Sequence, residues 1–313
     1  MSPAAPRVAA IGLGNMGLAM ATRLAAQGVP VTGWNRGPEP LAAAAGVGCA
    51  TAPTPRAAVA GATHVVVSVA DGPAFAAVAE GPEGFLEGLE PGAVVMAAST
   101  VAPAAVRDVA EAVAGRRASL VDTGLLGNPS HAASGQLRVY LGGADDAVVR
   151  ALPVAGLIGK EVRHVGPLGA GMRLKLVLNL VMGLEMQALA EATALAGALG
   201  VDPAEALDVI GGSGFASPVM AFKARRIATG RYDEPDFRLA LMAKDLGLAA
   251  SEAAAAGVDA PMTAAAAAAH ARAVALGLGA LDCAAIAAAV ADPSPAAEPA
   301  HARRAHRSVE ERT

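Results

Sequence analysis

The sequence predicts an α/β protein in which a doubly wound parallel sheet is followed by an all-helical C-terminal domain. Up to about residue 165, short apolar runs rich in β-branched residues alternate with Ala-rich helical stretches, a pattern typical of a parallel sheet. After this point the strands stop and the pattern is helical to about residue 290. A long helix, expected over residues 169–199, joins the two parts.

The boundaries of these elements follow from apolar runs, glycines and prolines. We expect domains at residues 1–168 and 169–290, and a disordered tail at 291–313, which is rich in Pro, Ala, Arg and Glu and has no apolar period. Breaks between the later helices are expected at 211–217, 230–235 and 257–261. The predicted strands are residues 8–11, 29–33, 64–69, 93–97, 119–122, 137–142 and 161–164.

Composition excludes several classes of protein. Of 313 residues, 54% are hydrophobic and 17% charged, which is enough apolar material for two packed cores. The net charge of -4 gives no basic surface for nucleic acid. The apolar stretch 174–184 is shorter than the ~20 residues that span a bilayer, so no membrane segment is expected. The first residues lack a basic region before an apolar core, so we expect no secretion signal. The isolated Cys49 and Cys283 favour reduced thiols, and we therefore expect a cytoplasmic protein.

A glycine-rich turn follows the first predicted strand and leads into a helical stretch. In this setting, the first glycine permits the turn, the second lets the backbone approach a pyrophosphate and the third lets helix and strand pack closely. The chain therefore predicts a dinucleotide-binding, Rossmann-type domain. The expected cofactor contacts in this turn are Gly12, Leu13, Gly14, Asn15, Met16 and Gly17.

The end of the second predicted strand favours NADP(H) as the cofactor. Asn35 and Arg36 stand where an NAD enzyme carries an acidic residue for the ribose hydroxyls. Asn35 removes that negative charge, and the guanidinium of Arg36 can pair with a 2′-phosphate. The alternative is that Arg36 is an ordinary surface arginine.

Two polar residues interrupt the long apolar helix and form a candidate catalytic pair. Lys175 and Asn179 are four residues apart, so a helix places them on one face, one turn from each other. A lysine among leucine and valine side chains tends to have a lowered pKa, which suits a general acid or base. The alternative is a lysine that extends to solvent while Asn179 makes a local hydrogen bond.

The glycine turn, the segment Gly169-x-Gly171-x-x-x-Lys175-x-x-x-Asn179 and the later Lys244-Asp245-Leu246 together resemble the β-hydroxyacid dehydrogenase family. The resemblance covers the chain to about residue 290. It implies that Lys175 is the catalytic acid or base and that Asn179 helps to position the substrate. The family includes 3-hydroxyisobutyrate dehydrogenases and tartronate semialdehyde reductases.

The resemblance also implies contacts at several weaker positions. For Lys244 and Asp245, the alternative is a solvated charged pair on a helix surface. The cofactor contacts implied are Val69, Ala70, Asp71, Ser99, Thr100 and Lys244; the substrate contacts are Gly127, Asn128, Phe237 and Asp245.

One departure from the family leaves the substrate open. The family usually reads Asp-Ala-Pro-Val-Ser-Gly-Gly where this chain has residues 122–128, so its carboxylate-binding serine is Leu126 here. Leucine cannot donate a hydrogen bond, which favours a neutral or amine-bearing substrate and the related imine reductases. Lys175 argues against an imine reductase, because imine reductases usually have a different residue at this position. A third reading is a binding module for NADPH without catalysis.

The apolar faces of the C-terminal helices predict a homo-oligomer. The long helix after Gly169 and the Ala-rich stretch at 262–276 offer more apolar surface than one small domain buries. By resemblance we expect a homodimer through the helical domain, and a tetramer is equally compatible with the sequence.

Overall fold

The computed structural model describes residues 5–291, and these form two compact units that divide between Leu178 and Asn179. The division falls inside one continuous helix, α8 (Ala170–Ala198), so this helix contributes to both units. Apart from Ala291, the predicted tail at 291–313 lies outside the described residues.

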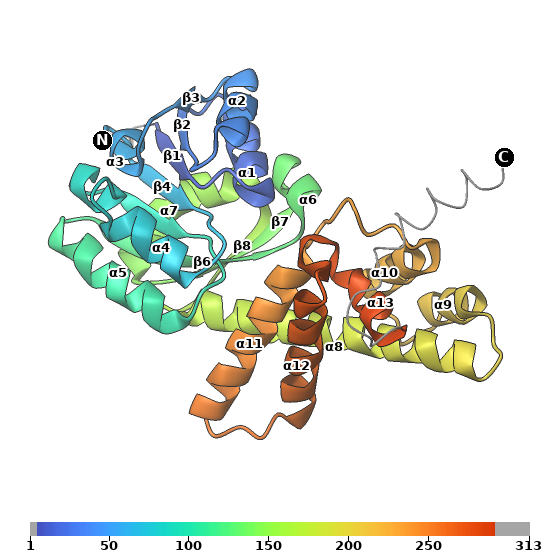
Figure 1. The fold of residues 1–313 in the computed structure, drawn as a ribbon. Helices are drawn as coiled ribbons and strands as arrows, with labels where there is room; N and C mark the ends of the chain where they lie inside the picture. Colours follow the sequence, from blue (N-terminus) through green and yellow to red (C-terminus); the bar gives the residue numbers. More distant parts are fainter. Residues whose placement is uncertain (1–4, 292–313) are drawn as a thin grey trace. The chain divides into compact units, whose positions relative to one another are not determined.

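The first unit is built on an eight-stranded, mostly parallel sheet with the order β3-β2-β1-β4-β5-β6-β7-β8 (Figure 1). This confirms the predicted fold class. The strands are β1 (Val8–Ile11), β2 (Val31–Trp34), β3 (Ala50–Thr51), β4 (His64–Val67), β5 (Val94–Ala97), β6 (Ser119–Leu126), β7 (Leu137–Gly142) and β8 (Gly159–Gly166).

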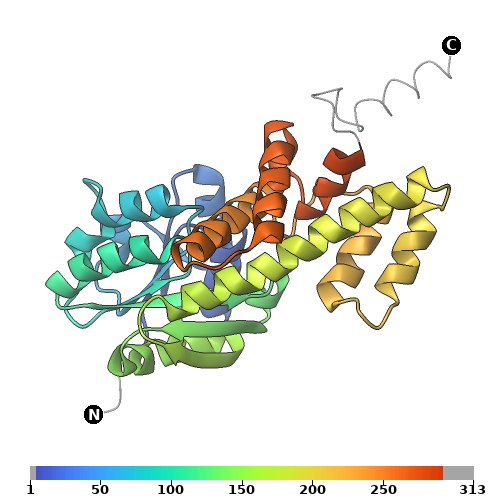
Figure 2. The ribbon, with the colours of Figure 1, turned by 90° about the horizontal axis from the view of Figure 1, so that it is seen from below.

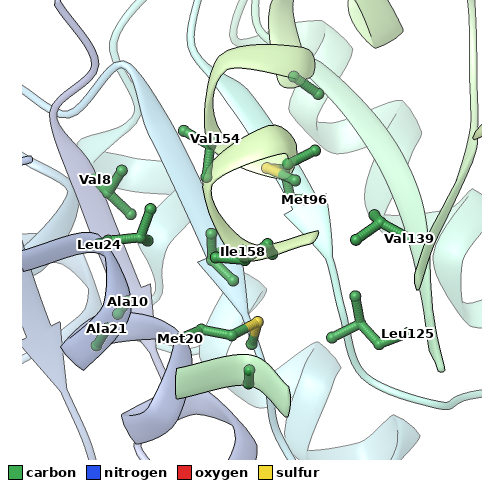
Figure 3. Close-up of a cluster of buried hydrophobic side chains, with 14 of the residues drawn as sticks. Val8, Ala10, Met20, Ala21, Leu24, Met96, Leu125, Val139, Val154 and Ile158 are labelled. Carbon is green, nitrogen blue, oxygen red and sulfur yellow. The ribbon is translucent and has the colours of Figure 1, made fainter. Parts of the chain in front are cut away.

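Helices cover both faces of this sheet, because its central strands are apolar on both sides. One face packs against α1 (Asn15–Ala26), α2 (Pro38–Gly46), α6 (Pro129–Ala133) and α7 (Asp145–Ile158). The other packs against α3 (Pro55–Val59), α4 (Gly72–Glu80), the 3-10 turn η1 (Phe85–Gly88) and α5 (Pro103–Gly115). Figure 3 shows the first of these cores, where side chains from α1 and α7 meet those of the strands.

Three features of the sheet differ from the sequence prediction. Strand β6 continues to Leu126 instead of ending at Asp122, because β7 pairs with it from Asp122 to Leu126. That pair is antiparallel, so the sheet is not parallel throughout. The two-residue strand β3 was not predicted, since two exposed residues show no apolar period.

The second unit is helical, as predicted. Gly200, with a φ of +78°, follows the end of α8, and the Asp202 side chain caps α9 by accepting from the Ala204 N–H. Its elements after α8 are α9 (Pro203–Gly211), α10 (Pro218–Thr229), α11 (Leu239–Ala255), α12 (Pro261–Ala275), η2 (Leu278–Ala280), η3 (Cys283–Ala285) and α13 (Ile286–Ala291). In Figure 2, α9 lies beside α10 and α11 beside α12. No helix within residues 5–291 has both the length and the hydropathy to cross a bilayer.

Two buried histidines have polar contacts that the sequence did not reveal. In the first unit, His64 contacts Thr63 Oγ1 and the Arg150 carbonyl oxygen, each at 2.8 Å. In the second unit, Nδ1 of His270 lies 2.9 Å from the Ala266 carbonyl oxygen, while its Nε2 has no hydrogen-bond partner among the described residues. Burial lowers the pKa of both rings below the ordinary value of 6.5.

The buried His270 predicts a loss of stability in mild acid. Below about pH 6.5 the His270 ring is protonated in the unfolded chain but stays neutral in the folded protein. The free energy of unfolding therefore falls as the pH drops from 6.5 toward the lower pKa of the folded state. His270→Gln should flatten this slope by up to about 1.4 kcal/mol per pH unit, measured by urea unfolding between pH 5 and pH 7. An unchanged slope in His270→Gln would contradict the prediction.

Candidate active site

The glycine turn lies between β1 and α1, where the sequence predicted it. Gly12 has a φ of +89°, and a Cβ there would collide with the carbonyl oxygen of Ser68. A Cβ at Gly17 would overlap the carbonyl oxygen of Gly12. Both positions therefore require glycine for the turn and for the packing of α1 against the sheet.

The protein's own packing does not require glycine at Gly14. It stands at the N-cap of α1 in an extended conformation, and a Cβ there would have no protein atom within 4 Å. The protein itself leaves room for a side chain at this position. The open space lies where unpaired backbone N–H groups begin α1, which is the arrangement that holds a pyrophosphate. The turn therefore fits a dinucleotide.

Asn35 braces this turn from the end of β2. Its side-chain oxygen accepts a hydrogen bond from the Leu13 N–H at 3.0 Å, and its amide nitrogen donates to the Gly37 carbonyl oxygen at 3.3 Å. Asn35 thus fixes the backbone of the glycine turn, a role that the sequence did not indicate. Arg36 beside it is exposed, as a residue that contacts a phosphate group from solvent must be.

The ends of β4 and β5 supply the next predicted cofactor contacts. Ser99 is buried, and its hydroxyl accepts from the Val69 N–H at 2.8 Å and donates to the Val67 carbonyl oxygen at 3.2 Å. It therefore holds the two strand ends together. Asp71 caps α4 by accepting from the Ala74 N–H. Ala70 is exposed, and Val69 and Thr100 are half-buried.

A buried carboxylate that the sequence analysis did not single out fixes the start of α8. Asp122 is fully buried on β6, and its two oxygens accept from the backbone N–H groups of Gly169 at 2.6 Å and Met172 at 2.5 Å. Burial raises the pKa of Asp122, and these two N–H groups and the charge of Arg173 oppose that rise. The carboxylate thus pairs two of the N–H groups that a helix N-terminus leaves unsatisfied.

Lys175 follows one turn later on α8 and is half-buried. It lies next to Gly124 of β6, since a Cβ on Gly124 would be 3.4 Å from the Cβ of Lys175 and 2.5 Å from the Gly171 carbonyl oxygen. Gly124 therefore gives α8 the room to lie close to β6 at the lysine. The structure therefore places Lys175, the predicted catalytic residue, beside β6 in the first unit.

In the second unit, Asn179, Lys244 and Asp245 form one hydrogen-bonded cluster. Asn179 is 1% exposed and donates from Nδ2 to Oδ2 of Asp245 at 2.5 Å. The other oxygen of Asp245 accepts from Lys244 Nζ at 2.7 Å. Asp245 is also 1% exposed, so the reading of a solvated surface pair is wrong for this residue. Gly183 allows the contact, because a Cβ there would collide with Leu246 of α11.

The predicted substrate contacts at the end of β6 have a defined local structure. Leu126 is the half-buried last residue of β6, and Gly127 has a φ of +138°. Asn128 caps α6, where its side-chain oxygen accepts from the His131 N–H at 3.0 Å. The Asn128 N–H donates to His131 Nδ1 at 3.3 Å, so His131 has a structural role on the surface.

Phe237 is half-buried just before α11, in a segment that a buried ion pair fixes. Its carbonyl oxygen accepts from the Cys283 N–H at 2.8 Å. The neighbouring Asp236 N–H donates to Asp282, which is fully buried and also binds Lys223 Nζ at 2.7 and 2.8 Å. Sequence reasoning missed this pair, because its partners are 59 residues apart.

The two kinds of glycine in the turn predict opposite effects of substitution. Gly14→Ala should leave the midpoint of thermal unfolding within about 2 °C but weaken dinucleotide binding at least tenfold, because the new methyl group clashes with no protein atom and would occupy the space expected for the pyrophosphate. Gly12→Ala should lower the midpoint by several degrees, because it strains a positive φ and meets Ser68. Differential scanning fluorimetry and NADPH fluorescence titration measure both effects. Unchanged NADPH affinity in Gly14→Ala would contradict this assignment.

Comparison with known proteins agrees with this architecture. Residues 7–166 match the family model described as the NAD binding domain of 6-phosphogluconate dehydrogenase. Residues 169–290 match the model described as NAD-binding of NADP-dependent 3-hydroxyisobutyrate dehydrogenase. The chain is 31% identical over 258 residues to 2-(hydroxymethyl)glutarate dehydrogenase of Eubacterium barkeri, covering 82% of this chain and 86% of that protein.

Solved structures show the same two-part fold. The crystal structure of 3-hydroxyisobutyrate dehydrogenase from Salmonella typhimurium has a TM-score of 0.83 at 26% identity, covering 90% of this chain and 99% of that chain. An imine reductase of Streptomyces aurantiacus has a TM-score of 0.59 at 26% identity, covering 90% and 98%. The glycine turn, the two matched models and these relatives together show that the chain belongs to the β-hydroxyacid dehydrogenase family of NAD(P)-dependent oxidoreductases.

Proposed function

We propose that this protein is an NADPH-dependent dehydrogenase or reductase of a small β-hydroxyacid or the corresponding aldehyde, with Lys175 as general acid and base. The position of Lys175 is the observation that carries the proposal. Lys175 is half-buried and lies beside Gly124 of β6. It follows by one turn the start of α8, which the Asp122 carboxylate holds by hydrogen bonds. A lysine held in this way can transfer a proton to or from a substrate oxygen.

The reaction divides between the cofactor and the protein. When bound, the nicotinamide supplies or accepts the hydride. In the direction of reduction, the Lys175 ammonium donates a proton to the oxygen of the carbonyl group as negative charge develops there. In the direction of oxidation, neutral Lys175 accepts the proton of the substrate hydroxyl. The backbone at Gly14 and the strand ends at Val69 and Ser99 would hold the cofactor.

We assign to Asn179 the role of orienting the substrate. Its Nδ2 faces the Asp245 carboxylate, which can only accept, so the orientation of the amide is fixed. The amide oxygen is then the group that Asn179 presents to a hydroxyl or an ammonium. Asp245, which also binds Lys244, holds Asn179 in this orientation.

The preference for NADPH is assigned to Arg36. This residue is exposed directly after Asn35, whose side chain is occupied with the backbone of the glycine turn and of Gly37. No acidic side chain stands at this strand end to repel a 2′-phosphate. The match to a model named for an NADP-dependent enzyme supports the same choice.

An imine reductase is the second candidate, and Leu126 is the observation that favours it. The end of β6 offers an apolar side chain at 126, and the Asn128 N–H already donates to His131 Nδ1. A substrate carboxylate would therefore find fewer hydrogen-bond donors here than in the family pattern. A neutral or amine-bearing substrate loses nothing at this position.

A substrate panel with a lysine variant tests the proposal. Purified protein should oxidise NADPH with one or more small β-carbonyl acids or their neutral analogues, followed at 340 nm. Lys175→Ala should lower kcat by about 10²- to 10⁴-fold, the usual contribution of a general acid. NADPH affinity should change less than twofold in this variant.

The matched control is Lys160→Ala, at an exposed lysine on β8, which should keep wild-type kcat. Turnover of cyclic imines alone would establish the second candidate. Binding of NADPH without turnover of any panel member would leave a binding module. Wild-type kcat in Lys175→Ala would refute the catalytic assignment.

A second variant tests the cofactor preference. Arg36→Ala should raise the KM for NADPH about 10- to 100-fold, because a charge-assisted hydrogen bond contributes about 1.5–3 kcal/mol. The KM for NADH should change less than threefold. Arg107→Ala, at an exposed arginine on α5, is the control. Equal changes for the two cofactors would contradict the role of Arg36.

A further inference from the structure

Asp122 is a buried acid on a strand whose packing does not by itself require a charged side chain. It is 0% exposed, on a strand whose neighbouring residues are also buried. An uncompensated carboxylate in such a place is costly, and this one is compensated by two backbone N–H groups from a segment about fifty residues later in the sequence. The contact therefore fixes two distant parts of the first unit to each other.

The segment that it fixes is the first turn of α8. The N–H groups of Gly169 and Met172 belong to the end of the helix that carries a partial positive charge, where an anion is most strongly bound. Charge-assisted hydrogen bonds are shorter and about twice as strong as neutral ones. Met172 is three residues before Lys175, so the clasp lies within one turn of the lysine.

Close packing makes the position of this turn specific. A Cβ on Gly142 would collide with Asp122, and one on Gly171 would collide with the Tyr140 carbonyl oxygen. With Gly124 beneath Lys175, glycines on β6, β7 and α8 let the helix lie directly on the strands. The carboxylate then selects one register of the helix along this surface.

We propose that Asp122 is a positioning residue for the reaction: its carboxylate clasps the N-terminus of α8 and so sets the place of Lys175 over Gly124. This inference rests on the proposed role of Lys175. Asp122 acts through the helix and does not contact the substrate. A displacement of about 1 Å at a catalytic group can reduce a rate about a hundredfold, so loss of the clasp should affect kcat far more than cofactor affinity.

Asp122→Asn is the direct test. The amide keeps the size of the side chain and one acceptor, but it presents an NH2 group to one of the two backbone N–H donors. We expect kcat to fall about 30- to 100-fold, with KM changed less than threefold and NADPH affinity less than twofold. Asp122→Ser, which keeps one acceptor and adds no bulk, serves if the asparagine variant does not fold. Its kcat should also fall at least tenfold.

The double variant Asp122→Asn with Lys175→Ala separates positioning from a general structural role. If Asp122 acts through Lys175, its substitution should change the residual rate of Lys175→Ala less than threefold. The matched control is Asp146→Asn, an exposed acid in the first turn of α7, which should keep wild-type kcat. A full additive loss in the double variant would overturn the inference, as would wild-type kcat in a folded Asp122→Asn protein. Wild-type kcat in Lys175→Ala alone would refute the proposed function instead.

Discussion

The hydrogen bonds between the Asp122 carboxylate and the first turn of α8 are the interaction on which the candidate site depends. They join β6 to the helix that leaves the sheet, and Lys175 lies one turn beyond them. The cost of burying the carboxylate is offset by two donors that would otherwise also be unsatisfied. Each group stabilises the other, so the charge and the helix end are buried together.

Glycines complete this arrangement by removing side chains where backbones meet. At Gly12, Gly17 and Gly171 the added carbon would collide with backbone oxygens, so the fold itself requires glycine there. At Gly14 the added carbon would meet only empty space. The contrast separates the glycines that packing requires from one that it does not require, which supports the proposed contact of Gly14 with the cofactor.

The features that the sequence predicted correctly are those with a local pattern. The apolar strands, the glycine turn and the helix breaks each depend on residues near to one another in sequence. Lys175 and Asn179 were recognisable because they interrupt an apolar helix. The antiparallel direction of β7 and the length of β6 depend on pairing between strands, which the pattern of a single strand does not specify. Asp122 and the structural roles of Asn35 and Asp245 were missed because the partners of these residues are distant in sequence, although an acid at the end of a predicted apolar strand was a visible signal.

Under the proposed function, hydride passes directly between NADPH and a carbon atom of the substrate. The most direct measurement uses NADPH labelled with deuterium at either face of C4 and mass spectrometry of the product of the best substrate. We expect one of the two labelled forms to yield a product heavier by one mass unit, with the deuterium on carbon. An unlabelled product from both forms would contradict direct hydride transfer.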